Sequence, residues 1–373
     1  MSAEITLKAF LLGHLRRWQS RGDLTVFANG AAPDLLARND VRAELRHVGI
    51  ERPIRPWADL RALFSLWWAL RRGRFDLVFS VTPKAGLVAM LAAWLARVPA
   101  RVHIFTGQVW ATRAGRARWL LKQLDKLMAA LATHVLVDGE PQRQFLLAEG
   151  VLQPGKGRVL ADGSLCGVDL QRFVPDASTR AAVRAEQGAP DDATVFLYLG
   201  RLNRDKGVLD LAQAFAQSCR THPGSQLWVV GPDEAGLTPQ LRELLASCES
   251  RVRLLPFAPQ PERLMAAADV FVLPSYREGF PTSVLEAAAC GLPTVAARVY
   301  GTQGALVEDE GGLMFTAGDV AELEDCLNRL VADASLRSRL GVSARQRAAQ
   351  SYAADRVLGA FAEFIESAAR RRA

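Results

Sequence analysis

The sequence is poor in cysteine and has no apolar run long enough to cross a membrane. The longest such run, Gly86–Leu95, falls far short of the roughly 20 residues that a spanning helix needs. No secretory leader is expected. The five cysteines are odd in number, widely spaced and without a CxxC pair. We therefore expect no disulfide framework and no zinc site, and a reducing cytosol is the natural compartment.

What the chain does have is apolar residues in quantity and an uneven charge. Half of its 373 residues are apolar and 23% are charged, which predicts packed globular structure of more than one domain. Residues 1–170 carry 24 Lys/Arg against 14 Asp/Glu, whereas residues 171–373 carry 22 against 25. The excess predicts a polyanionic neighbour for the first half. No nucleic-acid-binding signature accompanies it, so an anionic membrane surface is favoured over nucleic acid.

One stretch, residues 269–291, combines a buried strand, a polar loop and a short helix. The run Asp269–Leu273 predicts a parallel strand, and residues 282–290 predict a helix. Loops at the carboxyl ends of parallel strands bind ligands, and the helix amides suit an anion such as a diphosphate. Glu278 and Glu286 flank that position and suit sugar hydroxyls. Alternatively, Ser283 and Glu286 form a capping box, and Glu278 is an ordinary loop carboxylate.

A second strand, loop and helix lies upstream. Residues 194–199 predict a strand that ends at Gly200, and a helix is expected from Val208 to Cys219. Between them Arg201 and Lys206 present two cations, which suit phosphate oxygens. Surface cations near a turn are commonly only solvated. The pairing with two downstream glutamates favours a binding site for a nucleotide sugar.

These motifs together resemble the retaining nucleotide-sugar glycosyltransferases of family 4. Val81–Gly86 and Thr106–Trp110 are similar to segments of bacterial enzymes that build capsule, O-antigen or lipid-linked oligosaccharides. The resemblance implies an α/β protein with two Rossmann-like domains facing across a cleft, the GT-B fold. Residues 1–172 would form the acceptor-binding domain and residues 173–354 the donor-binding domain. Residues 355–373 would form a helix that crosses back to the first domain.

The beginning of the chain is unusual for such a domain. Residues 5–20 predict an amphipathic helix, and the strand Asp23–Ala28 follows it. Rossmann-like domains open on a strand instead, so the first domain is expected to lack its first strand. The alternative is a shortened strand at Ser2–Leu7. Further strands are expected at residues 75–81, 101–105, 133–138, 158–161, 226–231 and 252–257.

Two helices of the first half are rich in both apolar and basic residues. Trp57–Arg74 predicts a core helix lying on the sheet, with its terminal arginines complementing the helix end. In Arg113–Leu127 the cations Arg118, Lys122 and Lys126 recur along one face. That face either lies on a membrane or is simply solvated.

The resemblance also assigns roles to single residues. The expected catalytic residues are Arg201, Lys206 and Glu278. The expected donor-binding residues are Gly200, Phe257, Gly279, Phe280, Pro281, Thr282, Ser283 and Glu286. The expected acceptor-side residues are Lys84, His103, Gly107 and Gln108, although His103 also fits a core position in a strand. No metal and no cofactor are expected beyond the nucleotide-sugar co-substrate, because the histidines form no cluster and no Asp-x-Asp follows a strand.

The function expected from these features is retaining transfer of a sugar from a nucleoside diphosphate, with UDP expected first, to an acceptor hydroxyl. The expected acceptor is a lipid-linked saccharide of a bacterial surface polysaccharide or glycan. The expected location is cytoplasmic, peripheral on the inner face of the cell membrane. Two alternatives remain: a nucleotide-sugar epimerase of similar fold, which needs no acceptor, and an inactive nucleotide-binding module on a membrane.

Overall fold

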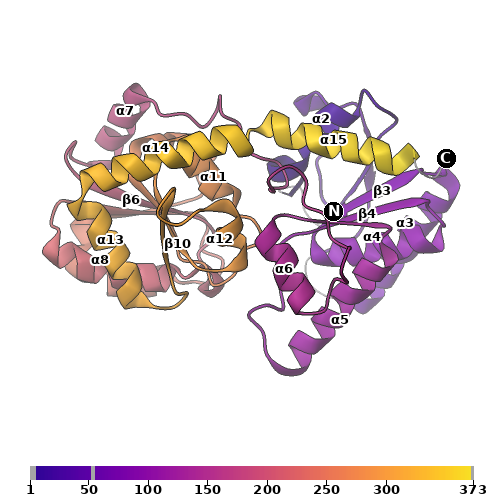
Figure 1. Ribbon diagram of the computed structural model, residues 1–373, viewed down its shortest axis with the longest axis horizontal. Coiled ribbons are helices and arrows are strands. Elements are labelled where there is room, and N and C mark those ends of the chain that lie inside the picture. Colours follow the sequence, from indigo (N-terminus) through magenta and orange to yellow (C-terminus); the bar gives the residue numbers. More distant parts are fainter. Residues whose placement is uncertain (1–5, 52–54, 371–373) are drawn as a thin grey trace. The chain divides into compact units, whose positions relative to one another are not determined.

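The chain folds into two compact units in a computed structural model that describes residues 6–51 and 55–370 (Figure 1). The first unit reaches to Gly167 and takes in the segment that starts at Ala354, and the second unit is Val168–Ala353. The sequence placed the boundaries at residues 172/173 and 354/355, close to these. The C-terminal helix α15 (Ala354–Arg370) packs on α2 (Leu12–Trp18) and so belongs to the first unit.

The first unit contains two separate parallel sheets. Strands β1 (Thr25–Ala28) and β2 (Glu44–His47) form one, and β3 (Leu77–Val81), β4 (Ala100–Phe105) and β5 (His134–Val137) form the other. A Rossmann-like order would place an opening strand between β1 and β3. Within the described residues the chain instead starts as helix, with η1 (Leu7–Leu11) running into α2. Of the alternative strand at Ser2–Leu7, Thr6 and Leu7 are helical, and the rest lies outside the described residues.

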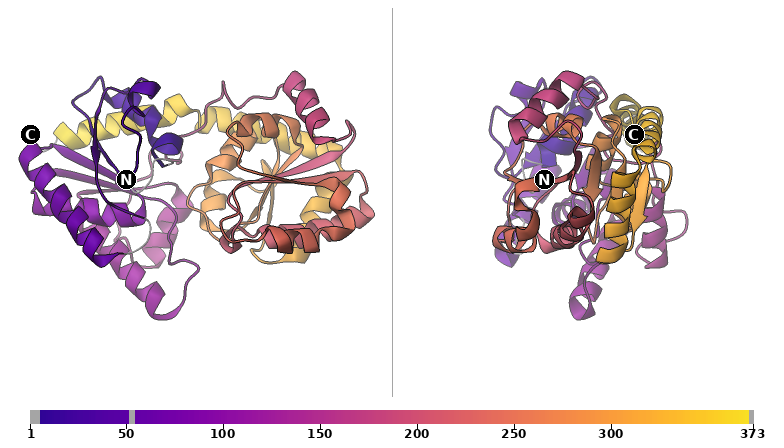
Figure 2. Two further views of the ribbon diagram at one scale, coloured as in Figure 1. Left: turned by 180° about the vertical axis from the view of Figure 1, so that it is seen from behind. Right: turned by 90° about the vertical axis from the view of Figure 1, so that its left-hand side faces the viewer.

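The helices of the first unit form a layer on each side of its strands (Figure 2). One layer consists of α3 (Pro56–Gly73), α4 (Pro83–Leu95) and α5 (Gly115–Leu131), which pack side by side. The other contains α2 and α15 (Figure 1). The helix α6 (Glu140–Ala148) follows β5, and the short η2 (Ala37–Asn39) precedes β2.

The second unit is built on one parallel sheet of six strands in the order β11-β10-β9-β6-β7-β8. These strands are β6 (Thr194–Leu199), β7 (Ser225–Val230), β8 (Val252–Leu255), β9 (Val270–Leu273), β10 (Thr294–Ala297) and β11 (Gly312–Phe315). The helices are α7 (Ala177–Gln187), α8 (Val208–Thr221), α9 (Thr238–Leu244), α10 (Pro261–Ala267), α11 (Thr282–Ala289), α12 (Tyr300–Ala305), α13 (Val320–Ala332) and α14 (Ala334–Ser351), with η3 (Arg204–Lys206) and η4 (Ala246–Arg251) between them.

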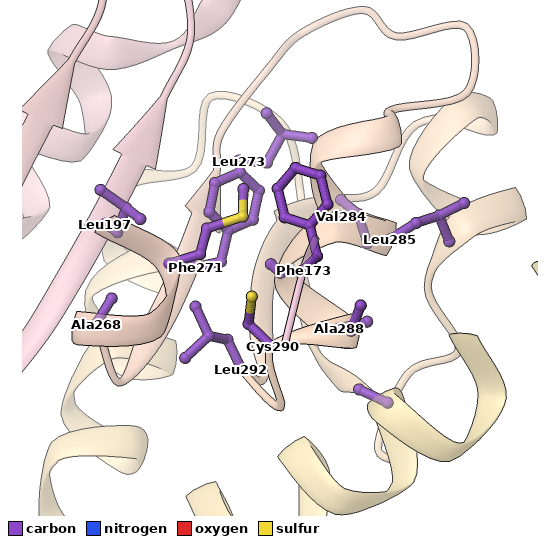
Figure 3. Packing of buried hydrophobic residues seen from close by; sticks show 14 of the residues in the cluster. Phe173, Leu197, Ala268, Phe271, Leu273, Val284, Leu285, Ala288, Cys290 and Leu292 are labelled. Atoms are coloured by element: carbon purple, nitrogen blue, oxygen red, sulfur yellow. The ribbon is translucent and has the colours of Figure 1, made fainter. Parts of the chain in front are cut away.

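Both faces of this sheet are buried, as expected for parallel strands that are apolar throughout. Every residue of β7, β9, β10 and β11 is buried. One core lies under α8 and α13, and the other lies under α7, α10, α11 and α14. Figure 3 shows the second core, where side chains of β9 and α11 point toward one another and Phe173 lies beside Val284. This packing fixes α11 against the strand that precedes it.

The predicted elements agree with these bounds to within a few residues, with one exception. Residues 158–161 were expected to form a strand, and this prediction is wrong. Only Arg158 pairs there, in an isolated bridge with Leu136. Gly157 has a positive φ and Ala161 another, so the segment turns before and after a single extended contact.

Candidate active site

The sheet of the second unit changes its winding direction between β6 and β9. From β6 the chain moves outward through β7 to β8, and it then returns to the other side of β6 for β9, β10 and β11. Loops at the carboxyl ends of strands on either side of such a point diverge and leave room for a ligand. The two motifs singled out in the sequence are the loops that follow β6 and β9. The topology therefore brings them to one place in the second unit.

Two glycines allow these loops to lie against each other. A Cβ on Gly207 would sit 2.0 Å from the carbonyl oxygen of Pro274, and Gly207 also has φ +63°. A Cβ on Gly301, in α12, would sit 2.3 Å from the carbonyl oxygen of Gly279 and 2.5 Å from that of Glu278. Any other residue would push the backbones apart. The loop that carries Glu278 is thus held between α12 and the loop after β6.

The contact at the centre of the site joins one predicted cation to one predicted carboxylate. Lys206 Nζ donates to Glu278 Oε1 at 2.5 Å, and both side chains are largely buried, 20% and 12% exposed. The backbone links the same loops, because Tyr276 N–H donates to Asp205 O at 3.0 Å. Glu278 also lies close enough to Tyr198 to influence it: burial, and then the charge of Glu278, raise the pKa of the Tyr198 hydroxyl.

Arg201 lies on the same edge of the sheet but has a different partner. Its guanidinium donates to Glu234 Oε2 at 2.7 Å, and both side chains are about half exposed. Its carbonyl oxygen accepts from the Tyr198 hydroxyl at 2.9 Å, which anchors the backbone while the side chain stays at the surface. The structure therefore brings Lys206 and Glu278 into contact, and it places Arg201 in an ion pair that the sequence did not predict.

The helix α11 begins in the loop that carries Glu278. Pro281 is the N-cap residue, with extended backbone and no side-chain cap. The capping box of Ser283 with Glu286 is thus absent, because Ser283 lies inside the first turn. Val284 N–H bonds to Pro281 O, and the amides of Thr282 and Ser283 precede it at the end of the helix where partial positive charge gathers. This end suits an anion.

Glu286 lies in the middle of α11 and is half-buried, near an ion pair that the sequence did not predict. Arg172 donates to Glu262 Oε2 through Nε at 3.1 Å and through the second guanidinium nitrogen at 2.8 Å. Burial raises the pKa of Glu286 to about 7; Arg172 opposes this rise and Glu262 adds to it. The guanidinium of Arg172 is already held by Glu262, so Glu286 has no cation of its own among the described residues. Its carboxyl group therefore suits neutral hydrogen-bonding groups such as hydroxyls.

The remaining predicted donor-side residues divide into exposed and packed ones. Phe257 follows β8 and is 63% exposed, so its ring is open to a ligand. The Phe280 ring instead packs on Tyr352, with ring centroids 5.6 Å apart. The side chain of Phe280 therefore belongs to the packing of the unit, whereas Gly279 and Pro281 can offer a donor only their backbone groups. Gly200 ends β6, and Gly231 approaches it so closely that a Cβ there would lie 1.9 Å from its oxygen.

The predicted acceptor-side residues lie in the first unit, at or near the carboxyl ends of β3 and β4. Lys84, in the first turn of α4, pairs with Asp59 of α3 at 2.6 Å. Gln108 is buried and donates to Thr106 O at 2.6 Å, and it accepts from Gln142 at 3.3 Å. Gly107, between Thr106 and Gln108 in the chain, is half-buried.

His103 is buried, and its Nδ1 bonds with the Ser80 hydroxyl at 2.8 Å. It also packs on the helix α4, because a Cβ on Gly86 would meet the imidazole at 2.4 Å. Burial lowers the pKa of His103 to about 3, so the ring is neutral. This place favours the core interpretation over a substrate contact.

Two residues at this edge were missed in the sequence. Thr82 has φ +70°, which is strained for a β-branched residue, and its hydroxyl is buried without a partner. Asp138 follows β5, with one carboxylate oxygen buried and without a hydrogen-bond partner. Burial raises the pKa of Asp138 to about 8. Strain and raised pKa values gather at functional sites, but neither can be read from the letters Val-Thr-Pro or Val-Asp-Gly.

Sequence comparison identifies both units. Residues 179–347 match the family of glycosyl transferases group 1, and residues 10–163 match the glycosyl transferase 4-like domain. A D-inositol 3-phosphate glycosyltransferase from Acidothermus cellulolyticus is 30% identical over 98% of this chain and 86% of its own length. The chain therefore belongs to the glycosyltransferase family to which these two models and this relative point. It is a glycosyltransferase, as the sequence motifs predicted.

Two further relatives are bacterial glycosyltransferases by name. The capsular polysaccharide biosynthesis glycosyltransferase CapM of Staphylococcus aureus is 27% identical over 82% of this chain and 80% of its own. The UDP-Gal:alpha-D-GlcNAc-diphosphoundecaprenol alpha-1,3-galactosyltransferase of Escherichia coli is 27% identical over 74% of this chain and 71% of its own.

The fold is shared with solved glycosyltransferase structures. HepE from Anabaena, in complex with UDP, superimposes with a TM-score of 0.80 at 21% identity, over 96% of this chain and 95% of its own. The predicted fold class, α/β with two Rossmann-like domains of GT-B type, is confirmed.

The described residues contain neither a cluster of metal ligands nor a membrane-spanning helix. No group of three or more His, Cys, Asp or Glu side chains in residues 6–51 and 55–370 is placed to hold a metal ion. No helix in the same part of the chain is long and apolar enough to span a membrane.

Proposed function

We propose that this glycosyltransferase moves a hexosyl group from a UDP-sugar to a hydroxyl of a lipid-linked saccharide, with retention of anomeric configuration, during assembly of a bacterial surface polysaccharide or glycan. The observation that carries the donor site is the Lys206–Glu278 contact at the switch point of the second sheet. A cation and a carboxylate at one spot suit a ligand with phosphate and hydroxyl groups. The second unit would bind the donor, and the first unit the acceptor.

The choice of UDP and of a lipid-linked acceptor rests on relatives. HepE is described in complex with UDP and with UDP-glucose. The Escherichia coli relative is named for a UDP-galactose donor and a diphosphoundecaprenol-linked acceptor. The chain shares the fold of HepE and is 27% identical to the Escherichia coli enzyme over 74% of its length, so it is a candidate for the same classes of substrate. Phe257, exposed beyond β8, is the candidate contact for the base.

In the proposed reaction the protein stabilises the departing diphosphate. Lys206 and the amides at the start of α11 would meet its negative charge, and Arg201 would join them by leaving Glu234. Groups held in place before charge develops lower the barrier most, because they need no reorganisation during the reaction. Glu278 would then orient a hydroxyl of the donor sugar, and Glu286 would hold the ribose hydroxyls.

The proposed step exchanges one bond for another at the anomeric carbon. The bond to the diphosphate oxygen breaks, and a bond to the acceptor oxygen forms on the same face of the sugar. The acceptor proton passes to an oxygen of the leaving phosphate, so no protein base is required. Lys206 and Arg201 supply the positive charge in this scheme, and we therefore propose a reaction without a metal ion.

A lipid-linked acceptor implies work at a membrane. We propose a peripheral location at the cytoplasmic face of the cell membrane, with the basic first unit near anionic lipid. The acceptor saccharide would then approach the carboxyl edge of β3–β5, where Lys84, Gln108 and the strained Thr82 lie.

The decisive experiment is a donor panel followed by turnover. The purified chain is screened by thermal shift with UDP, GDP and dTDP sugars, and the best donors are incubated with lipid-linked saccharides. We expect stabilisation by UDP donors and a product whose new glycosidic bond retains the donor configuration by NMR. An inverted product would overturn the mechanism. Epimerised donor formed without acceptor would point to an epimerase, and nucleotide binding without any turnover to an inactive module.

A further inference from the structure

Exposed apolar side chains of the described residues are concentrated on one helix layer of the first unit. Thirteen large apolar residues are exposed, and nine of them lie on α3, α4 and α5. Figure 2 shows these helices as a single layer beside the strands β3–β5. Monomeric proteins scatter such residues singly, and a gathered set marks an interaction surface. The nine are Trp57, Leu60, Phe64, Trp68, Trp94, Leu95, Trp119, Leu120 and Leu127.

The helix α3 carries the longest part of this surface, and here the sequence prediction is only half right. Its inner face packs in the core through Ala62, Leu66 and Leu70. Its outer face shows Trp57, Leu60, Phe64 and Trp68, at spacings of three and four residues, which places them in one row. Trp57 is 77% exposed and Phe64 is 62% exposed. α3 is therefore apolar on two opposite faces, and only one of them is covered by the unit.

The helix α5 is oriented opposite to the expectation that its basic face meets a surface. Arg118 and Lys122 both bond to Glu149 at 2.7 Å, and both lie near the ring of Trp110. Trp119 and Leu120 point outward instead, 63% and 53% exposed. The interpretation of α5 as a helix with a solvent- or membrane-facing row of cations is thus wrong for two of its three cations. The outward face adds to the aromatic layer.

The charge around the layer is strongly positive. Residues 55–131 contain thirteen Lys/Arg and three Asp/Glu. Their excess of ten positive charges equals the excess of the whole segment 1–170. Two of the three acids are already engaged, Asp59 with Lys84 and Asp125 with the Trp110 indole at 2.7 Å. The exposed arginines stand at helix ends and flanks, and Arg72 lies over the Trp68 ring at 4.3 Å. They are Arg55, which pairs with Glu51 at 3.1 Å, and Arg61, Arg71, Arg72, Arg74, Arg97, Arg113 and Arg116.

We propose that the outer face of α3, with the exposed aromatic residues of α4 and α5, is a docking surface for an anionic phospholipid bilayer. Tryptophan and phenylalanine enter the boundary between headgroups and acyl chains, and flanking arginines stay with the phosphates. Each basic residue near an anionic surface adds to the attraction. The combination of apolar rings with exposed arginines favours lipid over a protein partner, whose interface core would be depleted of charge.

This inference rests on the proposed lipid-linked acceptor only for its purpose. The Lys84–Asp59 pair ties the start of α4 to the start of α3. The docking surface therefore adjoins the edge of the first unit where the acceptor side is expected. A bilayer held there would present a membrane-anchored saccharide to that edge. The physical contact with lipid can be tested without donor, acceptor or turnover.

The test is vesicle binding by the full chain. Sedimentation is measured with vesicles of phosphatidylcholine alone and with equal parts of phosphatidylcholine and phosphatidylglycerol, at low and high salt. We expect binding to the anionic vesicles that weakens with salt, and quenching of tryptophan fluorescence by brominated acyl chains. The combined variant Trp57→Ser, Phe64→Ser, Trp68→Ser should bind the anionic vesicles at least about tenfold more weakly, because it removes the inserted rings. Val342→Ser, an equally exposed apolar residue of α14, is the matched control and should bind like the original chain.

Each outcome decides the proposal. Absence of binding to anionic vesicles would overturn it, as would equal binding by the triple variant. Self-association without lipid that the triple variant abolishes would assign the surface to a second copy of the chain instead. Because the substituted side chains lie on the outer face of α3 and leave its core face intact, thermal unfolding should change little. Turnover on a water-soluble acceptor saccharide should also be unchanged, so a failed lipid surface and a failed enzymatic assignment give different results.

Discussion

The ligand edge of the second unit and the outer face of the α3–α5 layer of the first unit hold their positive charges in different ways. At the ligand edge of the second unit each predicted or newly found cation has a glutamate partner: Lys206 with Glu278, Arg201 with Glu234, and Arg172 with Glu262. In the α3–α5 layer of the first unit, arginines stand exposed next to exposed aromatic rings. A compact anion needs cations held at fixed points, and carboxylates hold them. A broad anionic surface needs only density of charge, which salt screens.

The strongest test of this contrast is removal of the held cation. Lys206→Ala should lower turnover about a hundredfold or more, as expected for loss of one charge-stabilising group. Arg204→Ala, an exposed cation two residues away, should change turnover little. Initial rates with saturating donor measure both. Turnover of Lys206→Ala close to that of the original chain would remove Lys206 from the mechanism.

A second test moves the loop of Glu278 without changing its charge. In Gly301→Ala the new Cβ would overlap the carbonyl oxygens of Gly279 and Glu278, so the loop must shift. We expect about tenfold or more loss of turnover, and destabilisation by about 1–3 kcal/mol from the added atom. Gly224→Ala has open space at its Cβ and serves as the control. If the unfolding free energy and the turnover of Gly301→Ala equal those of the original chain, the close approach of α12 does not position Glu278.

A third test uses pH to probe the buried carboxyl group of Glu286 in α11. Burial raises the pKa of Glu286 from 4.5 to about 7, so the native state holds this proton more tightly than the unfolded chain. The stabilisation is complete below 4.5 and is lost as the pH rises through about 7. Relative to Glu286→Gln, the original chain should therefore lose unfolding free energy across this window.

Urea unfolding of both proteins at several pH values measures this difference. Asp125 and Asp138 are also buried with raised pKa values, but they titrate in both proteins and cancel. The exposed Glu249→Gln is the control for removal of a surface carboxylate. A difference between Glu286→Gln and the original chain that is constant with pH would show that Glu286 is not shifted.

The smallest expected effect concerns the exposed ion pair. Glu234→Gln frees Arg201 from its carboxylate, so affinity for UDP should rise about two- to fivefold, in line with the modest strength of surface ion pairs. Titration calorimetry measures it, with the exposed Glu243→Gln as control. Weaker UDP binding by Glu234→Gln would mean that the pair holds Arg201 in the productive position.

Much of the fold could be predicted because its signals are local. The runs at residues 194–199 and 269–273 are apolar throughout, and Gly200 and Pro274 end them, so strand and loop were recognisable. The helix before the first strand of the first unit was recognisable in the same way. The prediction of a strand at Arg158–Ala161 was wrong because a short apolar segment looks like a strand in the sequence. In the structure, turns on both sides leave only one bridge.

The candidate site was predictable as two loops but not as a set of contacts. The nearness of Lys206 and Glu278 followed from strand order, since both lie beyond adjacent parallel strands. Glu234, Glu262 and Arg172 were missed because an ion pair between residues 33 or 90 positions apart leaves no pattern in the sequence. The direction of α5 was misjudged because a helix with apolar and basic faces fits either orientation, and Glu149 decides it.

The sequence by itself determined two α/β domains, the loops that end their central strands, and the glycosyltransferase motifs. These depend on periodicity, glycine and proline, which act within a few residues. Only the tertiary structure decided which carboxylate each cation meets, which face of α3 and α5 points outward, and where backbone comes too close for a side chain. Those outcomes depend on segments far apart in the chain, and packing selects among arrangements that local preferences leave equal.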